Sequence, residues 1–317
     1  MKPQGFFFSI LLIVALPLST LTGCGAKEPA TLKVALLPIV DVLPAYVAER
    51  NGYLAAEGIQ VELVPVKSAQ ENSALLQADE VDGTLTDLQG VGLFNQESPQ
   101  VKVVAMARKA YPNAPVFRLL AAPGSAIDSP ADLAGVKIGV SNNTVIEYIT
   151  ERMLQGSGLT ADQIVLENIA AIPVRFEQLM NGQIQAATLP DPLASGAIAA
   201  GARPVIDDSQ FTQYSQSVLI FTTRALEEKP MAIRKFLTAW NKAVADLNTD
   251  PDAYRDLLIQ QGRVPESVQG SYAMPPFPQD EITSQTEWAD VVRWLQDKGL
   301  IDREIPYQDA VDTRFLK

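Results

Sequence analysis

The stretch Ser129-Pro-Ala-Asp-Leu-Ala-Gly-Val-Lys-Ile-Gly-Val140 contains the local order on which the fold depends. Its last five residues, 136–140, form a short apolar run that predicts a β-strand. Asn143 and Thr144 follow and are suited to begin a helix, which apolar spacing extends over residues 145–154. A strand that leads directly into a helix is the basic unit of a parallel sheet with helices on its faces.

The same alternation of strand and helix extends to both sides of this stretch. It occurs over residues 31–110 and again over residues 130–210, so we predict two α/β units built on parallel sheets. The two units share no residue-level repeat. A further strand is predicted at residues 217–223. The rest of the chain is predicted to be helical, over residues 230–247, 252–260 and 281–297.

The first 23 residues have the properties of a targeting segment. Lys2 gives a positive start, and residues 6–18 form an apolar run shorter than the roughly 20 residues that span a membrane. Leu21-Thr-Gly-Cys24 resembles the bacterial lipobox, in which cleavage leaves a lipid-bearing cysteine at the new N-terminus. We therefore expect Cys24 to be a lipid anchor, residues 24–30 to be a tether, and the body to be extracytoplasmic. The alternative is an ordinary secretory signal with an incidental cysteine.

Residue counts exclude several classes of function. The chain has no histidine and one cysteine. Internal disulfides, Ser-His-Asp or Cys-His catalysis and His-based zinc sites are therefore excluded. The net charge is −12 and no run of Lys or Arg occurs, so we expect no nucleic-acid partner. The sequence contains neither a Gly-rich phosphate loop nor a dinucleotide fingerprint, and we expect neither a cofactor nor a metal.

Five segments resemble those of ABC-importer solute-binding proteins, in the group that handles sulfonates, nitrate, thiamine-pyrimidine precursors and riboflavin. They occur in the order typical of that family and extend over essentially all of residues 31–300. Gln185 departs from the family, in which an aspartate is commoner at this place, and this departure leaves the ligand open. The segments are Tyr46-Val-Ala-Glu-Arg-Asn-Gly-Tyr-Leu-Ala-Ala-Glu-Gly-Ile-Gln-Val-Glu-Leu63, Ala74-Leu-Leu with Val81-Asp-Gly, the stretch 129–140, Leu179-Met-Asn-Gly-Gln-Ile-Gln-Ala-Ala187 and Leu189-Pro-Asp-Pro192.

The resemblance implies a type II periplasmic-binding-protein fold, with two Rossmann-like α/β lobes joined by two crossing strands and a helical C-terminal tail. The first lobe would comprise residues 31–117 and 213–317, and the second lobe residues 118–212. The crossing strands would be residues 116–122 and 217–223. A small molecule would bind in the cleft, the lobes would close on it, and an ABC permease with its ATPase would be the partner. We expect a monomer that touches the membrane through its lipid only.

Candidate ligand contacts follow from the rule that ligands bind beyond the carboxyl ends of strands in such sheets. Four loops lie there, at residues 37–44, 86–90, 141–144 and 189–192. An alternative for Asp87 and Thr144 is helix capping, and for Asp191 the stabilisation of a turn. An alternative for the aromatic candidates is a place in the core. The polar contacts that we predict are Asp41, Asp87, Asn142, Asn143, Thr144 and Asp191, and the stacking groups are Tyr46, Tyr148 and Phe176.

The charge of these loops indicates the kind of ligand. The loops contain three aspartates and no Lys or Arg, while Arg118 and Arg175 are the nearest cations. Carboxylates repel anions and accept hydrogen bonds from N–H and O–H groups. We therefore predict a binding protein, not an enzyme, for a neutral or cationic aromatic solute such as riboflavin or a thiamine-pyrimidine precursor. The alternatives are a receptor for a small anion such as a sulfonate or nitrate, a non-transport lipoprotein, and a carboxylate-based enzyme of the same fold.

Overall fold

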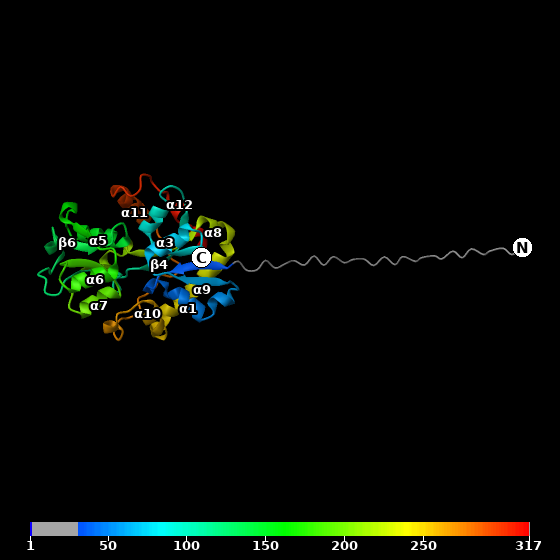
Figure 1. Ribbon diagram of the computed structural model, residues 1–317, viewed down its shortest axis with the longest axis horizontal. Helices are drawn as coiled ribbons and strands as arrows, with labels where there is room; N and C mark the ends of the chain where they lie inside the picture. The colour runs from blue at the N-terminus through cyan, green and yellow to red at the C-terminus, as the bar shows by residue number, and fades with distance from the viewer. Residues whose placement is uncertain (2–30, 317) are drawn as a thin grey trace.

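A computed structural model describes Met1 and residues 31–316 of the chain, which form two lobes that lie side by side (Figure 1). Over the described residues, each lobe is built on one five-stranded sheet with helices against its faces. The predicted two-lobed α/β fold is therefore confirmed. The signal segment, the tether and Cys24 lie outside the described residues.

The two sheets have the same plan. The first has the strand order β2-β1-β3-β10-β4 and the second has the order β7-β6-β8-β5-β9. In each sheet one strand, β10 or β5, runs antiparallel to both neighbours, so the prediction of purely parallel sheets is wrong at these two strands. Each of the two enters its sheet from the other lobe, which reverses its direction. The strands are β1 (Leu32–Leu36), β2 (Val61–Pro65), β3 (Gly83–Asp87), β4 (Val101–Lys109), β5 (Phe117–Ala121), β6 (Lys137–Val140), β7 (Val165–Asn168), β8 (Ala186–Pro190), β9 (Arg203–Asp207) and β10 (Gln216–Thr222).

The helices predicted over 145–154 and 230–247 are present as α5 and α9, whereas the two predicted nearer the C-terminus differ in extent. The helix predicted over 281–297 begins only at Gln285, because the Ser284 side chain accepts a hydrogen bond from Glu287 N and caps it there. The helix predicted over 252–260 is a 3-10 turn, η6 (Pro251–Tyr254), followed by α10. The α-helices are α1 (Leu43–Arg50), α2 (Tyr53–Ala56), α3 (Ala69–Gln77), α4 (Leu88–Phe94), α5 (Val145–Gly156), α6 (Ile172–Met180), α7 (Leu193–Ala199), α8 (Thr223–Glu228), α9 (Pro230–Thr249), α10 (Arg255–Gln261), α11 (Gln285–Asp297) and α12 (Tyr307–Ala310).

Helices bury both faces of each sheet. In the first lobe, α1 and α9 cover one face, and Phe236 and Trp240 of α9 pack there against the sheet. The other face is covered by α4 and α11, with Trp288 of α11 buried against it. In the second lobe α5 packs on one face of the sheet, and α6 and α7 pack on the other. Within residues 31–316, none of the helices combines the length and hydrophobicity that a membrane span requires.

The chain passes between the lobes twice, in residues 110–116 and 208–215. The predicted crossing strands are β5 and β10, and these two links lie directly before them. Asp208 joins the links, because its carboxylate accepts hydrogen bonds from Val116 N at 2.9 Å and Phe117 N at 3.1 Å. The side chain is fully buried. One acidic residue therefore fixes the relative position of the two segments about which the lobes would move.

Asp208 should make stability depend on pH in a way that an asparagine cannot reproduce. Burial raises the pKa of Asp208 to about 6, from an ordinary value of 3.8, although the hydrogen bonds from the amides of Val116 and Phe117 oppose the rise. The folded state therefore holds this proton more tightly than the unfolded state does. Its stabilising effect is complete below about pH 4 and is lost as the pH rises to about 6.

We expect the free energy of unfolding, relative to that of D208N, to fall by up to about 3 kcal/mol between pH 4 and pH 6. Urea unfolding of the wild type and D208N across this range measures the difference. D208N removes the titration and adds a constant loss, since one amide oxygen replaces two acceptors. Parallel pH profiles for the two proteins would show that Asp208 does not titrate with a raised pKa.

Candidate functional site

The predicted loops meet where the two lobes face each other. Asp41 lies in a 3-10 turn, η1 (Val40–Val42), before α1, and Asp87 is the last residue of β3. From the second lobe, residues 141–144 join β6 to α5, and Asp191 follows β8. The carboxyl ends of the parallel strands therefore carry these loops, as expected for a sheet of this type.

A row of polar side chains crosses the end of the first sheet. Strand register places Ser217 of β10 opposite Asp87 of β3 on one side and opposite Arg108 of β4 on the other. Directly opposite residues of antiparallel strands project to the same face. Asp87, Ser217 and Arg108 therefore share one face of the sheet at the edge nearest the second lobe.

Arg108 is the main residue of the site that the sequence did not reveal. Its Nη1 donates to Asp41 Oδ1 at 3.2 Å, and both side chains are largely buried, with 3% and 11% exposure. Burial opposes the charge of Arg108, but the neighbouring Asp41 holds the pKa of the guanidinium above its ordinary value. Among the described residues, Arg108 Nε and Nη2 and Ser217 Oγ have no hydrogen-bond partner. Buried donors in this state are suited to a further acceptor.

Tyr272, from the helical tail, lies beside this ion pair. Burial raises the pKa of the Tyr272 phenol, while the charges of Arg108 and Arg118 oppose the rise and that of Asp191 adds to it. Arg118 and Asp191 belong to the second lobe, so groups from both lobes act on one phenol. The region around Arg108 and Tyr272 therefore lies where the two lobes face each other.

Asp87 connects the lobes directly. Its Oδ1 accepts from Gly90 N at 2.7 Å and caps α4, and its Oδ2 accepts from Val145 N at 3.1 Å. Val145 is the first residue of α5 in the second lobe. The carboxylate therefore occupies the N-terminus of α5, where helix dipoles favour negative charge. Burial raises the pKa of Asp87, and the amides of Val145 and Gly90 oppose that rise.

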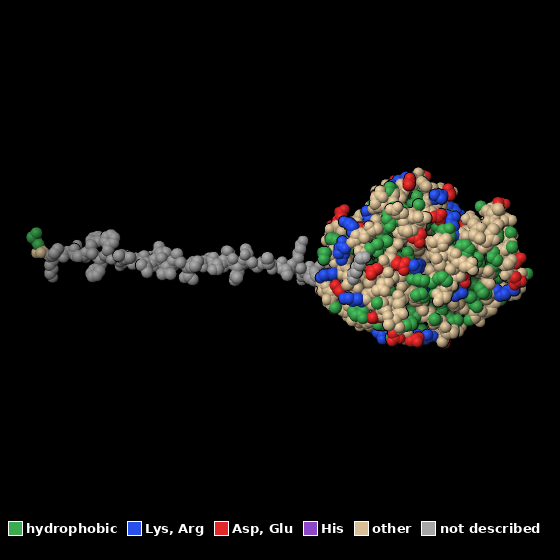
Figure 2. Space-filling model, turned by 180° about the vertical axis from the view of Figure 1, so that it is seen from behind, with side chains coloured by type: hydrophobic (Ala, Val, Ile, Leu, Met, Phe, Trp, Pro, Cys, Tyr) green, Lys and Arg blue, Asp and Glu red, His purple; other side chains and the backbone are tan. Residues whose placement is uncertain are grey.

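Asp191 is held within its own lobe. Its Oδ2 accepts from Arg118 Nε at 3.0 Å and Nη2 at 2.9 Å, and its Oδ1 accepts from Ser195 N and Oγ. Arg118 thus neutralises Asp191, as Arg108 neutralises Asp41. The negative charge predicted for the loops is therefore largely balanced, because Asp41 and Asp191 are ion-paired with arginines from β4 and β5, one of them the predicted neighbouring cation Arg118. Figure 2 shows a similar mixture of acidic and basic side chains on the outer surface that it displays.

The loop 141–144 contains a helix-capping threonine and two exposed asparagines. Thr144 Oγ1 accepts from Ile146 N and caps α5, so the capping alternative applies to Thr144 as it does to Asp87. Asn142 and Asn143 are exposed. Asn143 has a φ of 62°, and its N–H donates to Glu147 Oε2 at 2.6 Å. Both asparagine side chains are therefore accessible at the cleft, and whether they touch a ligand stays a prediction.

Arg175 lies beneath this loop as a buried cation. Its Nη1 donates to Ser141 Oγ at 2.8 Å and to Ile169 O at 2.7 Å, and no carboxylate of the described residues pairs with it. Burial lowers its pKa to about 10. A Cβ at Gly139 would lie 3.2 Å from Arg175 Cγ and Cδ, so the glycine leaves room for this side chain. Arg175 supports the loop from below.

The three predicted stacking groups have other neighbours in this structure. Tyr148 is 1% exposed, its ring lies edge-on to Trp294 and Tyr214, and its hydroxyl donates to Asp290 Oδ2 at 2.5 Å. Tyr46 and Phe176 are half-buried at the edges of the two lobe cores. The three rings therefore pack in or against the lobe cores, as the alternative expected. Tyr148 also contacts the other lobe.

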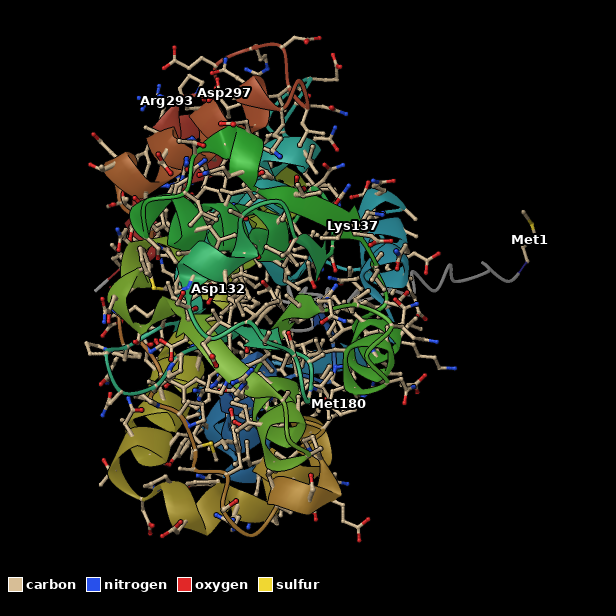
Figure 3. All side chains as sticks on the ribbon, turned by 90° about the vertical axis from the view of Figure 1, so that its left-hand side faces the viewer. Met1, Asp132, Lys137, Met180, Arg293 and Asp297 are labelled. Atoms are coloured by element: carbon tan, nitrogen blue, oxygen red, sulfur yellow. The ribbon has the colours of Figure 1, made fainter. Side chains whose placement is uncertain are left out.

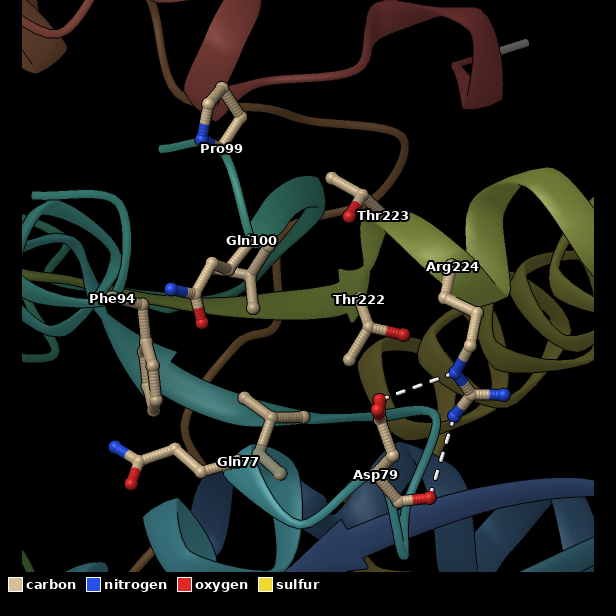
Figure 4. Close-up of a pocket in the computed structure, with 10 residues that line it drawn as sticks. Gln77, Asp79, Phe94, Pro99, Gln100, Thr222, Thr223 and Arg224 are labelled. Carbon is tan, nitrogen blue, oxygen red and sulfur yellow. Dashed lines mark hydrogen bonds and ion pairs between the residues drawn. The ribbon is translucent and has the colours of Figure 1, made fainter. Parts of the chain in front are cut away.

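Two cavities lie away from the predicted residues. One, of about 220 Å³, lies at the opposite end of the first sheet, where Arg224 pairs with Asp79 beside Thr222 (Figure 4). The other, of about 330 Å³, lies beside the second interlobe link and is lined by Arg152, Tyr214 and Asp290 among others. Neither contains a predicted ligand contact. Among residues 31–316, no cluster of three or more His, Cys, Asp or Glu side chains is placed to hold a metal ion.

Comparison with known proteins gives a consistent set of relatives. The profile described as "NMT1/THI5 like" matches residues 40–254. The riboflavin-binding protein RibY of Chloroflexus aurantiacus is 23% identical, with 91% of this chain and 86% of the relative covered. A formylaminopyrimidine-binding protein of Halalkalibacterium halodurans is 23% identical, with 98% of both chains covered. A putative aliphatic sulfonates-binding protein of Bacillus subtilis is 24% identical, with 97% of this chain and 95% of the relative covered.

Solved structures share the fold at lower identity. The aliphatic sulphonate-binding protein SsuA of Escherichia coli superposes with a TM-score of 0.76 at 17% identity, covering 89% of this chain and 97% of SsuA. The desulfurization enzyme DSZB superposes with a TM-score of 0.69 at 16% identity, covering 90% of this chain and 97% of the enzyme. The type II periplasmic-binding fold is thereby confirmed, and it occurs among these neighbours in both a binding protein and an enzyme.

Proposed function

We infer, from the premise that this chain belongs to the NMT1/THI5-like family, that its cleft captures a small neutral solute with a polar heterocyclic ring. The chain is a solute-binding protein of the ABC-import type that serves sulfonates, thiamine precursors or riboflavin. In this proposal a monomer, anchored through Cys24, delivers its solute to a permease and its ATPase.

The ion pair of Arg108 and Asp41 is the observation that carries this proposal. It places a guanidinium and a carboxylate together, with Arg108 Nη1 3.2 Å from Asp41 Oδ1, and Arg108 Nε and Nη2 have no partner among the described residues. A ring edge with an acceptor next to an N–H group complements that arrangement, because both partners of each hydrogen bond are then satisfied. Flavin and pyrimidine rings have such edges. A simple oxyanion has acceptors only, so it could use the free N–H groups of Arg108 but could donate nothing to the remaining acceptor capacity of Asp41.

Asp87 favours the same class of ligand. Its carboxylate already occupies the N-terminus of α5, which is otherwise the natural place in the second lobe for an anionic group. An anion at this helix would have to displace Asp87 or lie against it. A neutral ring with N–H or O–H groups would instead use the remaining acceptor capacity of the carboxylate.

A sulfonate is the second candidate, and it has its own supporting observation. Arg108 Nε and Nη2 are buried without partners among the described residues, and two such N–H groups fit an oxyanion. A catalytic role is the weaker alternative. Asp41, Asp87 and Asp191 are each engaged in ion pairs or amide contacts, and the chain has no histidine to act as a base near neutral pH.

Binding should follow the order flavin or formylaminopyrimidine above alkanesulfonate. Titration calorimetry of the full chain with riboflavin, a formylaminopyrimidine and a short alkanesulfonate measures this directly. We expect micromolar or tighter binding, of about −8 kcal/mol or better, for one of the two ring compounds. Native mass spectrometry of gently purified protein provides an independent check through any solute that is retained. Tighter binding of the sulfonate would support the second candidate instead. If none of the three compounds binds, the proposed function is wrong.

A further inference from the structure

We propose that Glu147 is a positioning residue that couples the contact between the lobes to the conformation of the loop 141–144. Its two carboxylate oxygens have different partners. Oε2 accepts from Asn143 N at 2.6 Å, within the loop, and Oε1 accepts from Lys298 Nζ at 2.7 Å, from the first lobe. One side chain therefore contacts both the predicted ligand loop and the opposite lobe.

The contact between α5 and α11 includes two polar groups, beside the ring contact of Tyr148 with Trp294 and the hydrogen bond from Trp294 Nε1 to Glu151 Oε2 at 2.6 Å. In the first, Lys298, directly after α11, donates to Glu147 and to Glu151 Oε1 at 2.6 Å. In the second, Asp290 of α11 accepts from Tyr148 Oη and from Arg152 Nε at 3.0 Å. Figure 1 shows α11 beside α5, and Figure 3 shows α11, labelled at Arg293 and Asp297, along the edge of the second lobe. Only the first group reaches the loop.

The loop needs the support that Glu147 gives. Asn143 has a φ of 62°, in the left-handed region that costs a non-glycine residue energy. Its N–H is held there by a charged acceptor, and such hydrogen bonds are stronger than neutral ones. The Glu147 side chain is 7% exposed, so its charge requires a counter-ion, and Lys298 is that cation.

The coupling follows because Asn143 depends on Glu147 and Glu147 depends on Lys298. When the lobes separate, Lys298 must leave Glu147, and a nearly buried carboxylate without its cation is driven toward water. Asn143 N then loses its acceptor and the strained loop can relax. The proposal rests on the proposed function only in assigning residues 141–144 to the ligand. The alternative is that Glu147 merely caps α5 and is indifferent to Lys298.

Hydrogen exchange of the ligand-free full chain separates these two possibilities. K298M removes the cation, whereas D290N weakens the same helix contact through the second group, which does not touch the loop. We expect exchange in a peptide covering residues 141–147 to become about tenfold faster in K298M and in E147Q, and to change less than twofold in D290N. K298R keeps the charge and should restore wild-type protection.

Two outcomes would overturn the coupling: loop protection in K298M equal to that in the wild type, or equal loss of protection in K298M and D290N. Paired spin labels on α5 and α11 report in the same samples whether each variant loosens the lobes, which both K298M and D290N should do. No solute is present in these measurements. Their failure would leave the proposed function intact, and failure of the ligand titrations would leave this result intact.

Discussion

Replacing Arg108 with methionine is expected to lower the free energy of unfolding by about 3–5 kcal/mol, because it leaves a buried carboxylate without its cation. The Asp41 side chain is 11% exposed, and the Arg108 guanidinium is the group that pairs with it. Methionine fills most of the volume of the arginine stem, so lost packing contributes little. Urea denaturation of R108M and the wild type at neutral pH measures the difference.

Two further variants make this result specific. In D41N/R108M both charges are absent, and we expect most of the lost stability to return. In R50M the exposed pair of Arg50 and Asp256 is broken, and the cost should stay below about 1 kcal/mol. If R108M and R50M had the same free energy of unfolding, the pair of Arg108 and Asp41 would contribute no more than an exposed ion pair.

Ligand titrations of these variants separate an effect on folding from an effect on binding. D41N/R108M should fold nearly as well as the wild type but bind the captured solute at least about 100-fold more weakly, since two charge-assisted hydrogen bonds are lost. A double variant that regains stability and also binds normally would show that the pair is structural only.

The fold could be predicted from the sequence because its signals are local. Short apolar strands, capping residues and glycine stops recur along residues 31–210, and the predicted strands and helices lie at these places. The direction of β5 and β10 could not be predicted this way. Both strands have ordinary strand sequences, and only the path of the chain between the lobes reverses them.

In the site too, interactions between residues close in sequence could be predicted, and those between distant residues could not. Asp87 and Thr144 could be predicted to cap helices because their partners lie two or three residues away. Arg108 could not be linked to Asp41, because the two residues lie 67 positions apart and meet only through folding.

The contacts of Tyr148 could not be predicted either, because they also join residues that are distant in the sequence. Its partner Asp290 is 142 residues away, so the sequence could indicate an aromatic ring near the cleft but not that a helix of the C-terminal tail covers it. The charge balance of the site could not be predicted in full for the same reason. The aspartates lie in loops and are visible in the sequence, whereas their arginine partners lie within strands and become neighbours only through folding.

Asp41 should determine which class of ligand the cleft prefers. In D41N we expect the affinity for riboflavin or formylaminopyrimidine to fall about 100-fold, because the carboxylate that accepts a ring N–H is replaced by an amide. The amide oxygen can still accept from Arg108, so the fold should largely survive. Affinity for an alkanesulfonate should be retained or increased, since Arg108 then has no anion to neutralise it.

Titration of D41N with all three compounds tests this expectation, and D256N, which removes an exposed aspartate paired with Arg50, is the matched control. Unchanged affinity for the ring compounds in D41N would contradict the role given to Asp41. The direction of the sulfonate change is the more decisive observation. A carboxylate beside an arginine weakens anion binding if the site evolved for neutral rings, so its removal should help the anion. If removal instead weakens sulfonate binding, Asp41 serves to orient the Arg108 guanidinium toward an oxyanion, and the pair would then belong to a sulfonate receptor.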